Sequence, residues 1–195
     1  MGAADSGGIL SRGELALNGG NLNNARGTIA ASGSAGLTVQ DTDNTDGNIL
    51  SDRTLSLLSD TVSNLRGLLQ SAGMLTLDTH HHAFINKDSG KTGGIIAGGD
   101  IHITGGRFDG DHGVLAGQNV SISTGEETLS HQGGRLDAAG SLHLETGKLD
   151  NNAGRIRAGG NLEADTHGLT LINSDSGTEG GIFSVSAPSG TWGKN

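Results

Sequence analysis

The 195-residue chain contains 36 glycines, one proline, no cysteine and only 2% aromatic residues. The glycines do not recur at every third position, which excludes collagen, and the lack of cysteine excludes disulfide cross-links. The formal net charge of −9 argues against nucleic acid or an anionic membrane as a partner, because both need clustered lysine and arginine.

The two ends of the chain differ from its middle. Residues 1–6 have neither the basic region nor the apolar stretch of a secretory signal peptide, so we interpret them as a linker in front of a piece of a longer protein. Residues 7–186 form one repetitive domain. Residues 187–195 leave the pattern at Pro188, which lacks a backbone donor, and we expect Trp192 to lie over the end of the core.

A short motif recurs through residues 7–186. It reads Gly-x-[Ile/Leu]-x-[Ala/Ser/Gly] and is followed by an aliphatic-x-aliphatic triplet. Its successive intervals are 20, 20, 20, 26, 20, 21, 20 and 26 residues, which is the signature of a solenoid. The motif begins at Gly7, Gly27, Gly47, Gly67, Gly93, Gly113, Gly134, Gly154 and Gly180.

Within each repeat the apolar residues alternate with polar or small ones. The second residue after each motif glycine is always Ile or Leu, as at Ile49 and Leu136, and the fourth is always small. The triplet has the same period of two, as in Leu55-Ser56-Leu57. This alternation predicts strands with one buried face, and the helical spacing of three and four is absent.

A third short strand is predicted after each triplet, with an apolar residue followed two places later by Asn. Three strands per repeat predict a triangular coil, and about nine such coils form a parallel β-helix. We expect glycines at fixed places to provide positive φ at the corners. We also expect a structural column of inward asparagines, each bonded to the next coil: Asn24, Asn44, Asn64, Asn86, Asn151 and Asn173.

Residues 78–95 and 165–182 resemble each other at an offset of 87, and both 26-residue intervals arise there. The extra segments, Lys87–Thr92 and Ser174–Glu179, should bulge from the shaft. Loops on a rigid scaffold often bind ligands, but tolerated insertions without function are the simpler interpretation. The candidate binding residues are Phe84, Lys87, Asp88, Ser89, Lys91, Asp175, Ser176 and Glu179.

The residues that could carry chemistry do not form a convincing constellation. His80, His81 and His82 are consecutive on an extended segment, so their side chains cannot all face one metal ion. The acidic run from Asp41 to Asp46 lacks the spacing of an EF-hand loop. A polysaccharide-cleaving enzyme would need a tight carboxylate group, and an ice-binding face would need a continuous threonine array. We therefore predict no enzyme, no metal and no cofactor.

The repeats resemble those of the haemagglutinin-repeat exoproteins, which include filamentous haemagglutinin and contact-dependent growth-inhibition effectors. The segments TLSHQGGRLDAAGSLHLET, KLDNNAGRIRAGGNLEADT and NLNNARGTIAASGSAGLTV come close to the family pattern LxNxGGxIxAxGxLxLxT. The resemblance implies a right-handed β-helix, secretion through an outer-membrane transporter partner, and a rod at the bacterial cell surface. The expected function is a monomeric structural shaft, with a receptor- or carbohydrate-binding module acting through the two loops as the alternative.

Overall fold

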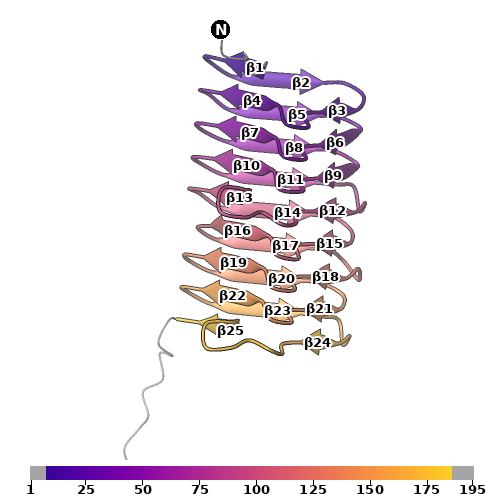
Figure 1. Ribbon diagram of the computed structural model, residues 1–195, viewed down its shortest axis with the longest axis vertical. Helices are drawn as coiled ribbons and strands as arrows, with labels where there is room; N and C mark the ends of the chain where they lie inside the picture. The colour runs from indigo at the N-terminus through magenta and orange to yellow at the C-terminus, as the bar shows by residue number, and fades with distance from the viewer. Residues whose placement is uncertain (1–7, 186–195) are drawn as a thin grey trace, which may run out of the picture.

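The computed structural model describes residues 8–185, and all regular structure in this range is β-strand (Figure 1). Three strands make one coil, and each strand pairs in parallel with its counterparts in the coils above and below. The chain forms eight complete coils and the first strand of a ninth, close to the nine expected. Residues 1–6 and 187–195, with Trp192, lie outside the described residues. Within residues 8–185 there is no helix that could cross a membrane.

The 25 strands form one nine-stranded and two eight-stranded sheets. The first sheet contains β1 (Gly8–Ser11), β4 (Thr28–Ala31), β7 (Asn48–Ser51), β10 (Leu68–Ser71), β13 (Gly94–Ala97), β16 (Val114–Gly117), β19 (Arg135–Ala138), β22 (Arg155–Ala158) and β25 (Gly181–Ser184). The second contains β2 (Leu15–Asn18), β5 (Ala35–Thr38), β8 (Leu55–Leu58), β11 (Leu75–Asp78), β14 (Ile101–Thr104), β17 (Val120–Ser123), β20 (Leu142–Glu145) and β23 (Leu162–Asp165). The third contains β3 (Leu22–Asn23), β6 (Asp41–Asp43), β9 (Thr61–Ser63), β12 (Phe84–Ile85), β15 (Phe108–Asp109), β18 (Leu129–Ser130), β21 (Leu149–Asp150) and β24 (Leu171–Ile172).

The core is a set of aliphatic columns that run along the shaft. Ile49 is fully buried and lies in register between Ile29 and Leu69 of the neighbouring coils. One inward pair is aromatic, because Phe84 and Phe108 stack in adjacent coils with ring centroids 4.6 Å apart. Each side chain therefore packs on its own counterpart, so the hydrophobic stabilisation of one coil depends on its neighbours.

The expectation that glycines provide positive φ at the corners holds at Gly133 but is wrong for most regular coils, where another residue type takes this conformation. The residue immediately before the motif glycine has the left-handed conformation, with φ of 57° at Arg26, 54° at Asp46 and 53° at Arg66. The glycine itself is required by close packing, since a Cβ at Gly67 would lie only 2.5 Å from the side-chain oxygen of Asn64. Glycine thus makes room for the asparagine three residues earlier.

The asparagine side chains form two hydrogen-bonded runs along this corner. The amide of Asn24 donates to Asn44 at 2.7 Å, Asn44 donates to Asn64 at 2.7 Å, and Asn64 donates to Asn86 at 2.9 Å. The second run consists of Asn151, which donates to Asn173 at 2.9 Å. All of these side chains are buried except that of Asn173, which lies in the last complete coil. Between the runs the equivalent positions are Gly110 and His131.

We predict that Ile49→Asp destabilises the shaft far more than Ser56→Asp does. Ile49 is fully buried, so the new carboxylate would be unpaired in the core at a cost of several kcal/mol, whereas Ser56 is exposed on the neighbouring sheet. Thermal melting of both variants measures the difference. Equal melting temperatures would contradict the inward register of Ile49.

We also predict that Asn64→Leu costs about 1–3 kcal/mol, because it removes a buried amide and leaves its partners unsatisfied. Those partners are the donor Asn44 and three acceptors: Asn86, the carbonyl of Gly67 and the carbonyl of Gly94. Urea unfolding measures the loss, and Asn21→Leu at an exposed position is the control. A loss no larger than that of the control would mean that the amide contributes nothing to stability.

Candidate functional site

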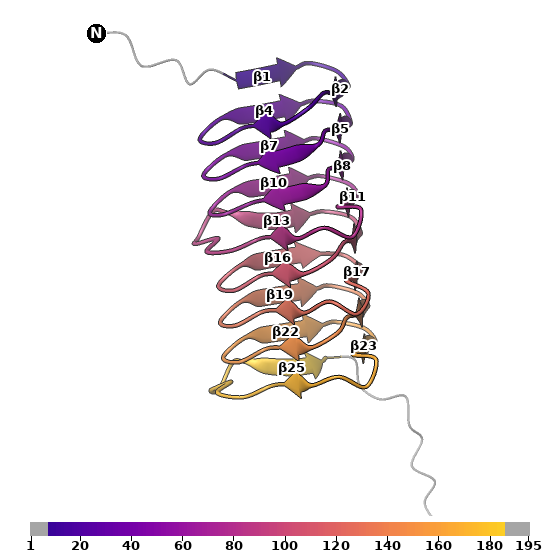
Figure 2. The same ribbon diagram turned by 90° about the vertical axis from the view of Figure 1, so that its right-hand side faces the viewer.

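The two inserts lie at the same corner of the shaft, between the third and first sheets. Lys87–Thr92 connects β12 to β13, and Ser174–Glu179 connects β24 to β25. Figure 2 shows both inserts on one side of the molecule, with the regular corners before β16, β19 and β22 between them. The predicted loops therefore face the same way and stand apart along the long axis.

The first insert is anchored from inside by Ser89. In a regular coil the first N–H of a first-sheet strand donates to the motif glycine of the coil before, as Arg135 does to the carbonyl of Gly113. The insert displaces this arrangement, and the N–H of Val114 instead donates to the Ser89 hydroxyl at 3.0 Å. Ser89 is only 4% exposed, so its hydroxyl supports the next coil instead of facing solvent.

The remaining candidate residues divide into buried and exposed sets. Phe84 is 1% exposed and lies in the core, so it cannot contribute to a binding surface on the insert. Lys87 is half-buried, with its ammonium 3.4 Å from a carboxylate oxygen of Asp109. Lys91 is exposed at the tip of the first insert.

The second insert repeats the backbone of the first. Asp175 has φ of 52° and Gly177 has φ of 60°, matching 51° at Asp88 and 60° at Gly90. Ser176 is half-buried at the position equivalent to Ser89, and its carbonyl accepts from the N–H of Gly180 at 2.8 Å. Asp175 and Glu179 are exposed. The inserts are therefore two copies of one structural element with different surface charges.

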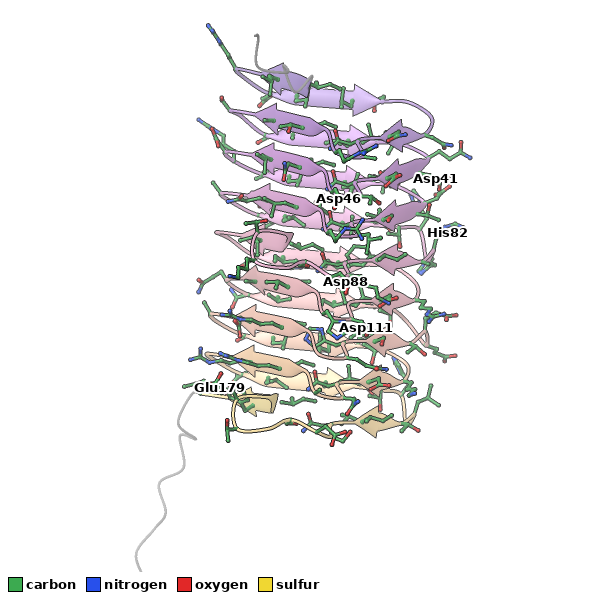
Figure 3. The ribbon with its side chains drawn as sticks, viewed as in Figure 1. Asp41, Asp46, His82, Asp88, Asp111 and Glu179 are labelled. Atoms are coloured by element: carbon green, nitrogen blue, oxygen red, sulfur yellow. The ribbon has the colours of Figure 1, made fainter. Side chains whose placement is uncertain are left out.

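Asp88 belongs to a column of alternating charge at the left-handed corner position. Moving along the shaft, this column contains Arg26, Asp46, Arg66, Asp88 and His112. Arg66 forms two hydrogen bonds to Asp46, at 2.8 and 2.9 Å, and Asp88 lies 3.4 Å from His112. The bond to Arg66 lowers the pKa of the Asp46 carboxyl. Figure 3 shows Asp46 and Asp88 one below the other along the shaft, near the middle of the view.

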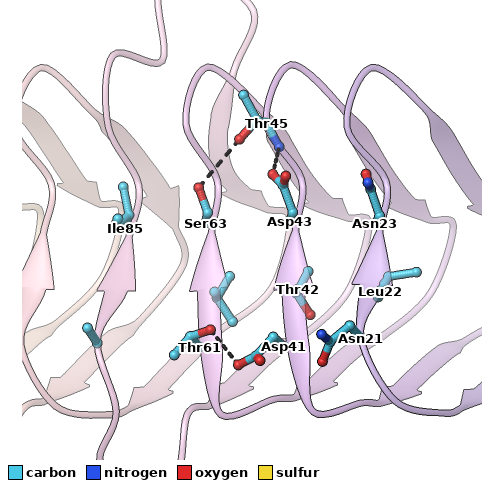
Figure 4. Close-up of a pocket in the computed structure, with 12 residues that line it drawn as sticks. Asn21, Leu22, Asn23, Asp41, Thr42, Asp43, Thr45, Thr61, Ser63 and Ile85 are labelled. Carbon is cyan, nitrogen blue, oxygen red and sulfur yellow. Dashed lines mark hydrogen bonds between the residues drawn. The ribbon is translucent and has the colours of Figure 1, made fainter.

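A hollow with a volume of about 660 Å³ lies on the outer face of the third sheet (Figure 4). Its rim carries Asp41 and Asp43, the acidic run considered for calcium. Asp41 accepts from the Thr61 hydroxyl at 2.6 Å, and Asp43 accepts from the N–H of Thr45 at 2.9 Å. Asn44 is buried in the asparagine column. Asp41 and Asp43 therefore lie on the outer face, each bonded to a threonine, while Thr42 and Asn44 point inward. The run does not gather its side chains around one point.

The histidine run also diverges. His80 contacts Asp60 of the preceding coil at 2.7 Å, while the ring of His82 lies 3.1 Å from the carbonyl of Thr79. His80 and His81 both have positive φ, at 49° and 66°, which turns the segment around a corner. Within residues 8–185, no group of three or more histidine and carboxylate side chains is arranged to hold a metal ion.

Comparison with known proteins agrees with the repeat geometry. A sequence model of the haemagglutinin repeat matches residues 1–81, 70–127 and 116–178. The chain belongs to the haemagglutinin-repeat family. It is also 28% identical over 142 residues to the tRNA nuclease CdiA-2 of Burkholderia pseudomallei (strain 1026b), and this match covers 71% of the chain but 4% of that protein. No solved structure matches the chain significantly.

The haemagglutinin-repeat register shows what the sequence analysis missed. Arg135, Arg155 and Arg157 are distant in sequence but adjacent on the outer face of the first sheet, because Arg135 pairs with Arg155 in register. The signal was present in the sequence, since all three occupy the first or third position after a motif glycine. Aligning outward positions as well as inward ones would have found them.

His131 interrupts the asparagine column of the haemagglutinin repeats. It is buried, and its Nε2–H donates to the carbonyl of Arg155 at 3.2 Å, much as Asn44 donates to the carbonyl of Leu68. It does not reach the next asparagine, and the buried side-chain oxygen of Asn151 has no hydrogen-bond partner among the described residues. Burial lowers the pKa of His131, despite the opposing effects of the Arg155 carbonyl and of Asp111 and Asp137.

We predict that His131→Asn stabilises the protein by about 0.5–1.5 kcal/mol at pH 8, because an asparagine can donate to the orphaned oxygen of Asn151. The variant should also lose part of its acid sensitivity. Since the pKa of His131 is lowered in the folded state, the unfolded state binds more protons below about pH 6.5, so wild-type stability falls as the pH drops through that value.

Urea unfolding from pH 8 to pH 5 tests both effects, with His102→Asn on the exposed face of β14 as the control. The acid loss of stability should become smaller in His131→Asn and remain unchanged in His102→Asn. An identical pH profile for all three proteins would show that His131 is not the group responsible.

Proposed function

We propose that this chain is a shaft segment of a large secreted bacterial exoprotein that delivers a toxin or adheres to cells. The observation that carries the proposal is the repeat itself, which is matched along residues 1–178 and continues without a break through eight stacked coils. Each coil contacts only its neighbours, so adding coils makes the stack longer without changing its cross-section. The result is a long and stiff rod. The outer-membrane transporter that secretes such proteins is the partner that we propose.

The similarity to CdiA-2 supports a non-enzymatic role for this segment. The chain spans 4% of that protein, so the nuclease activity in its name belongs to a protein many times longer. Many polar side chains of residues 8–185 pair between coils, as in His80 with Asp60 and Arg66 with Asp46. We propose that these pairs serve the stack and that catalysis lies elsewhere in the parent protein.

A second candidate function is receptor or carbohydrate binding through the inserts. The observation that favours it is the repetition of one backbone at both inserts, with Asp88 and Gly90 matched by Asp175 and Gly177. Two similar loops facing the same way could contact one extended ligand at two points. Their exposed residues Lys91, Asp175 and Glu179 would provide the polar contacts.

We predict that removing both inserts leaves the fold intact and abolishes any specific binding to cells that the inserts provide. Trimming each corner to the 20-residue register restores the motif glycine as the acceptor for the next strand, so Ser89 is no longer needed. Circular dichroism measures the fold and a saturation assay measures binding. Saturable binding that survives trimming would show that the binding site lies on a flat face of the shaft and not on the inserts. If neither protein binds saturably, the segment acts only as a shaft.

A further inference from the structure

The outer face of the first sheet changes character along the shaft. In the coils from β7 to β16 its outward positions include Leu50, Leu68, Ile96 and Val114, all half-buried. At β19 and β22 the same positions become Arg135, Asp137, Arg155 and Arg157. Three guanidinium groups thus surround one carboxylate, which leaves a local charge of +2 on a protein whose net charge is −9.

The single carboxylate does not satisfy this cluster. The Nε–H of Arg135 donates to one carboxylate oxygen of Asp137 at 2.5 Å. The nearest approach of Arg155 to the other oxygen is 3.7 Å, beyond hydrogen-bond range, and both that oxygen and the buried Nε of Arg155 have no hydrogen-bond partner among the described residues. No carboxylate within residues 8–185 forms an ion pair with Arg157. Among the described residues, Arg155 and Arg157 therefore have no carboxylate within hydrogen-bond distance.

A hollow bordered by Arg157, and the partly exposed ring of Phe183, both lie beside these groups. The hollow has a volume of about 500 Å³, and Arg135, Asp137 and Arg157 line it together with five alanine or glycine residues. Phe183 follows Arg157 in the same column and is 37% exposed, and the guanidinium of Arg155 lies 5.9 Å from its ring centroid. The surface thus combines guanidinium groups, small side chains and one partly exposed aromatic ring.

We propose that this surface, formed by Arg135, Asp137, Arg155, Arg157 and Phe183, binds an anionic saccharide. The guanidinium groups of Arg155 and Arg157 bind a carboxylate or sulfate, because arginine donates paired hydrogen bonds to such oxyanions. Phe183 packs against the apolar face of the sugar ring. The small residues of the floor admit the chain of a polysaccharide along the shaft.

The surroundings favour a saccharide over other anionic polymers. A peptide that adds a strand needs a free sheet edge, but β19 pairs with β16 and β22, and β22 pairs with β19 and β25. A nucleic acid needs a longer row of cations than three arginines on an acidic protein. A rigid, paired and shallow face suits a flat, hydroxyl-rich ligand. The site is separate from the tips of the inserts, so saccharide binding here can be tested independently of any binding by the inserts.

The test compares three polysaccharides with the same backbone: dextran, carboxymethyl-dextran and dextran sulfate. The whole chain should bind at least one charged form about tenfold or more tightly than dextran, and the preferred form identifies the oxyanion. Arg155→Gln/Arg157→Gln should lose about tenfold or more of this affinity, and Phe183→Ala should lose affinity for the polysaccharide while retaining weak competition by inorganic sulfate. Trimming the inserts should leave the binding unchanged.

The matched control is Arg12→Gln/Arg53→Gln, which removes the same charge from two exposed corners in the N-terminal half. Its affinity should equal that of the wild type. An equal loss in the control would reduce the effect to net charge and overturn the proposal. Equal binding of dextran and its charged forms, or no binding of any of the three, would also overturn it. Binding of polyglutamate as tight as that of dextran sulfate would rule out saccharide recognition.

Discussion

The packing of one coil on the next is the constraint from which the rest of the structure follows. A single coil cannot pair its own strands, because all strand pairing runs between coils. The backbone, the aliphatic columns and the asparagine column must therefore all repeat at one spacing. Gly67 illustrates the coupling, since its missing Cβ leaves the space filled by the side chain of Asn64. The period near 20 residues is a consequence of this shared register.

The sequence was sufficient to predict what repeats. The inward aliphatic column, the three strands per coil and the inward asparagines all come from residues that keep their chemical type from coil to coil. The left-handed corner position could not be recognised in this way, because Arg26, Asp46 and Ala153 share a conformation but no chemical property. The expectation that glycine occupies it followed from intrinsic preference and holds only at Gly133 among the regular coils, because the corner geometry overrides that preference elsewhere.

The candidate site was harder to predict because the inserts depart from the repeat. Ser89 and Phe84 lie within or beside the first insert, and a loop suggests exposure, yet both are buried. Ser89 is buried because the insert removes an acceptor that the following strand still needs. Phe84 is buried because its strand remains in register with Phe108. A loop residue in a solenoid is therefore exposed only where it neither packs against the neighbouring coils nor bonds to them.

The shaft is not uniform, and its irregularities lie close together. Gly110 and His131 separate the two runs of the asparagine column, and the unpartnered oxygen of Asn151 lies directly beyond them. Gly110 is required there because a Cβ would meet the ring of Phe108 at 2.7 Å. The larger aromatic side chain has thus displaced the asparagine. These coils follow the first insert, so the asparagine column is interrupted where the regular spacing has just changed.

The alternating charges of the corner distinguish one coil from the next, which the core residues do not. The aliphatic columns are nearly identical in every coil, and asparagine repeats through the first four coils at Asn24, Asn44, Asn64 and Asn86. These residues alone would therefore allow a coil to pair with the next coil but one. Skipping the coil that contains Asp46 would place Arg26 beside Arg66, and skipping the next would place Asp46 beside Asp88. Like charges at strand spacing are destabilising, although each exposed pair contributes little by itself. Summed over the column, these small terms select the correct order of coils among alternatives that the core treats alike.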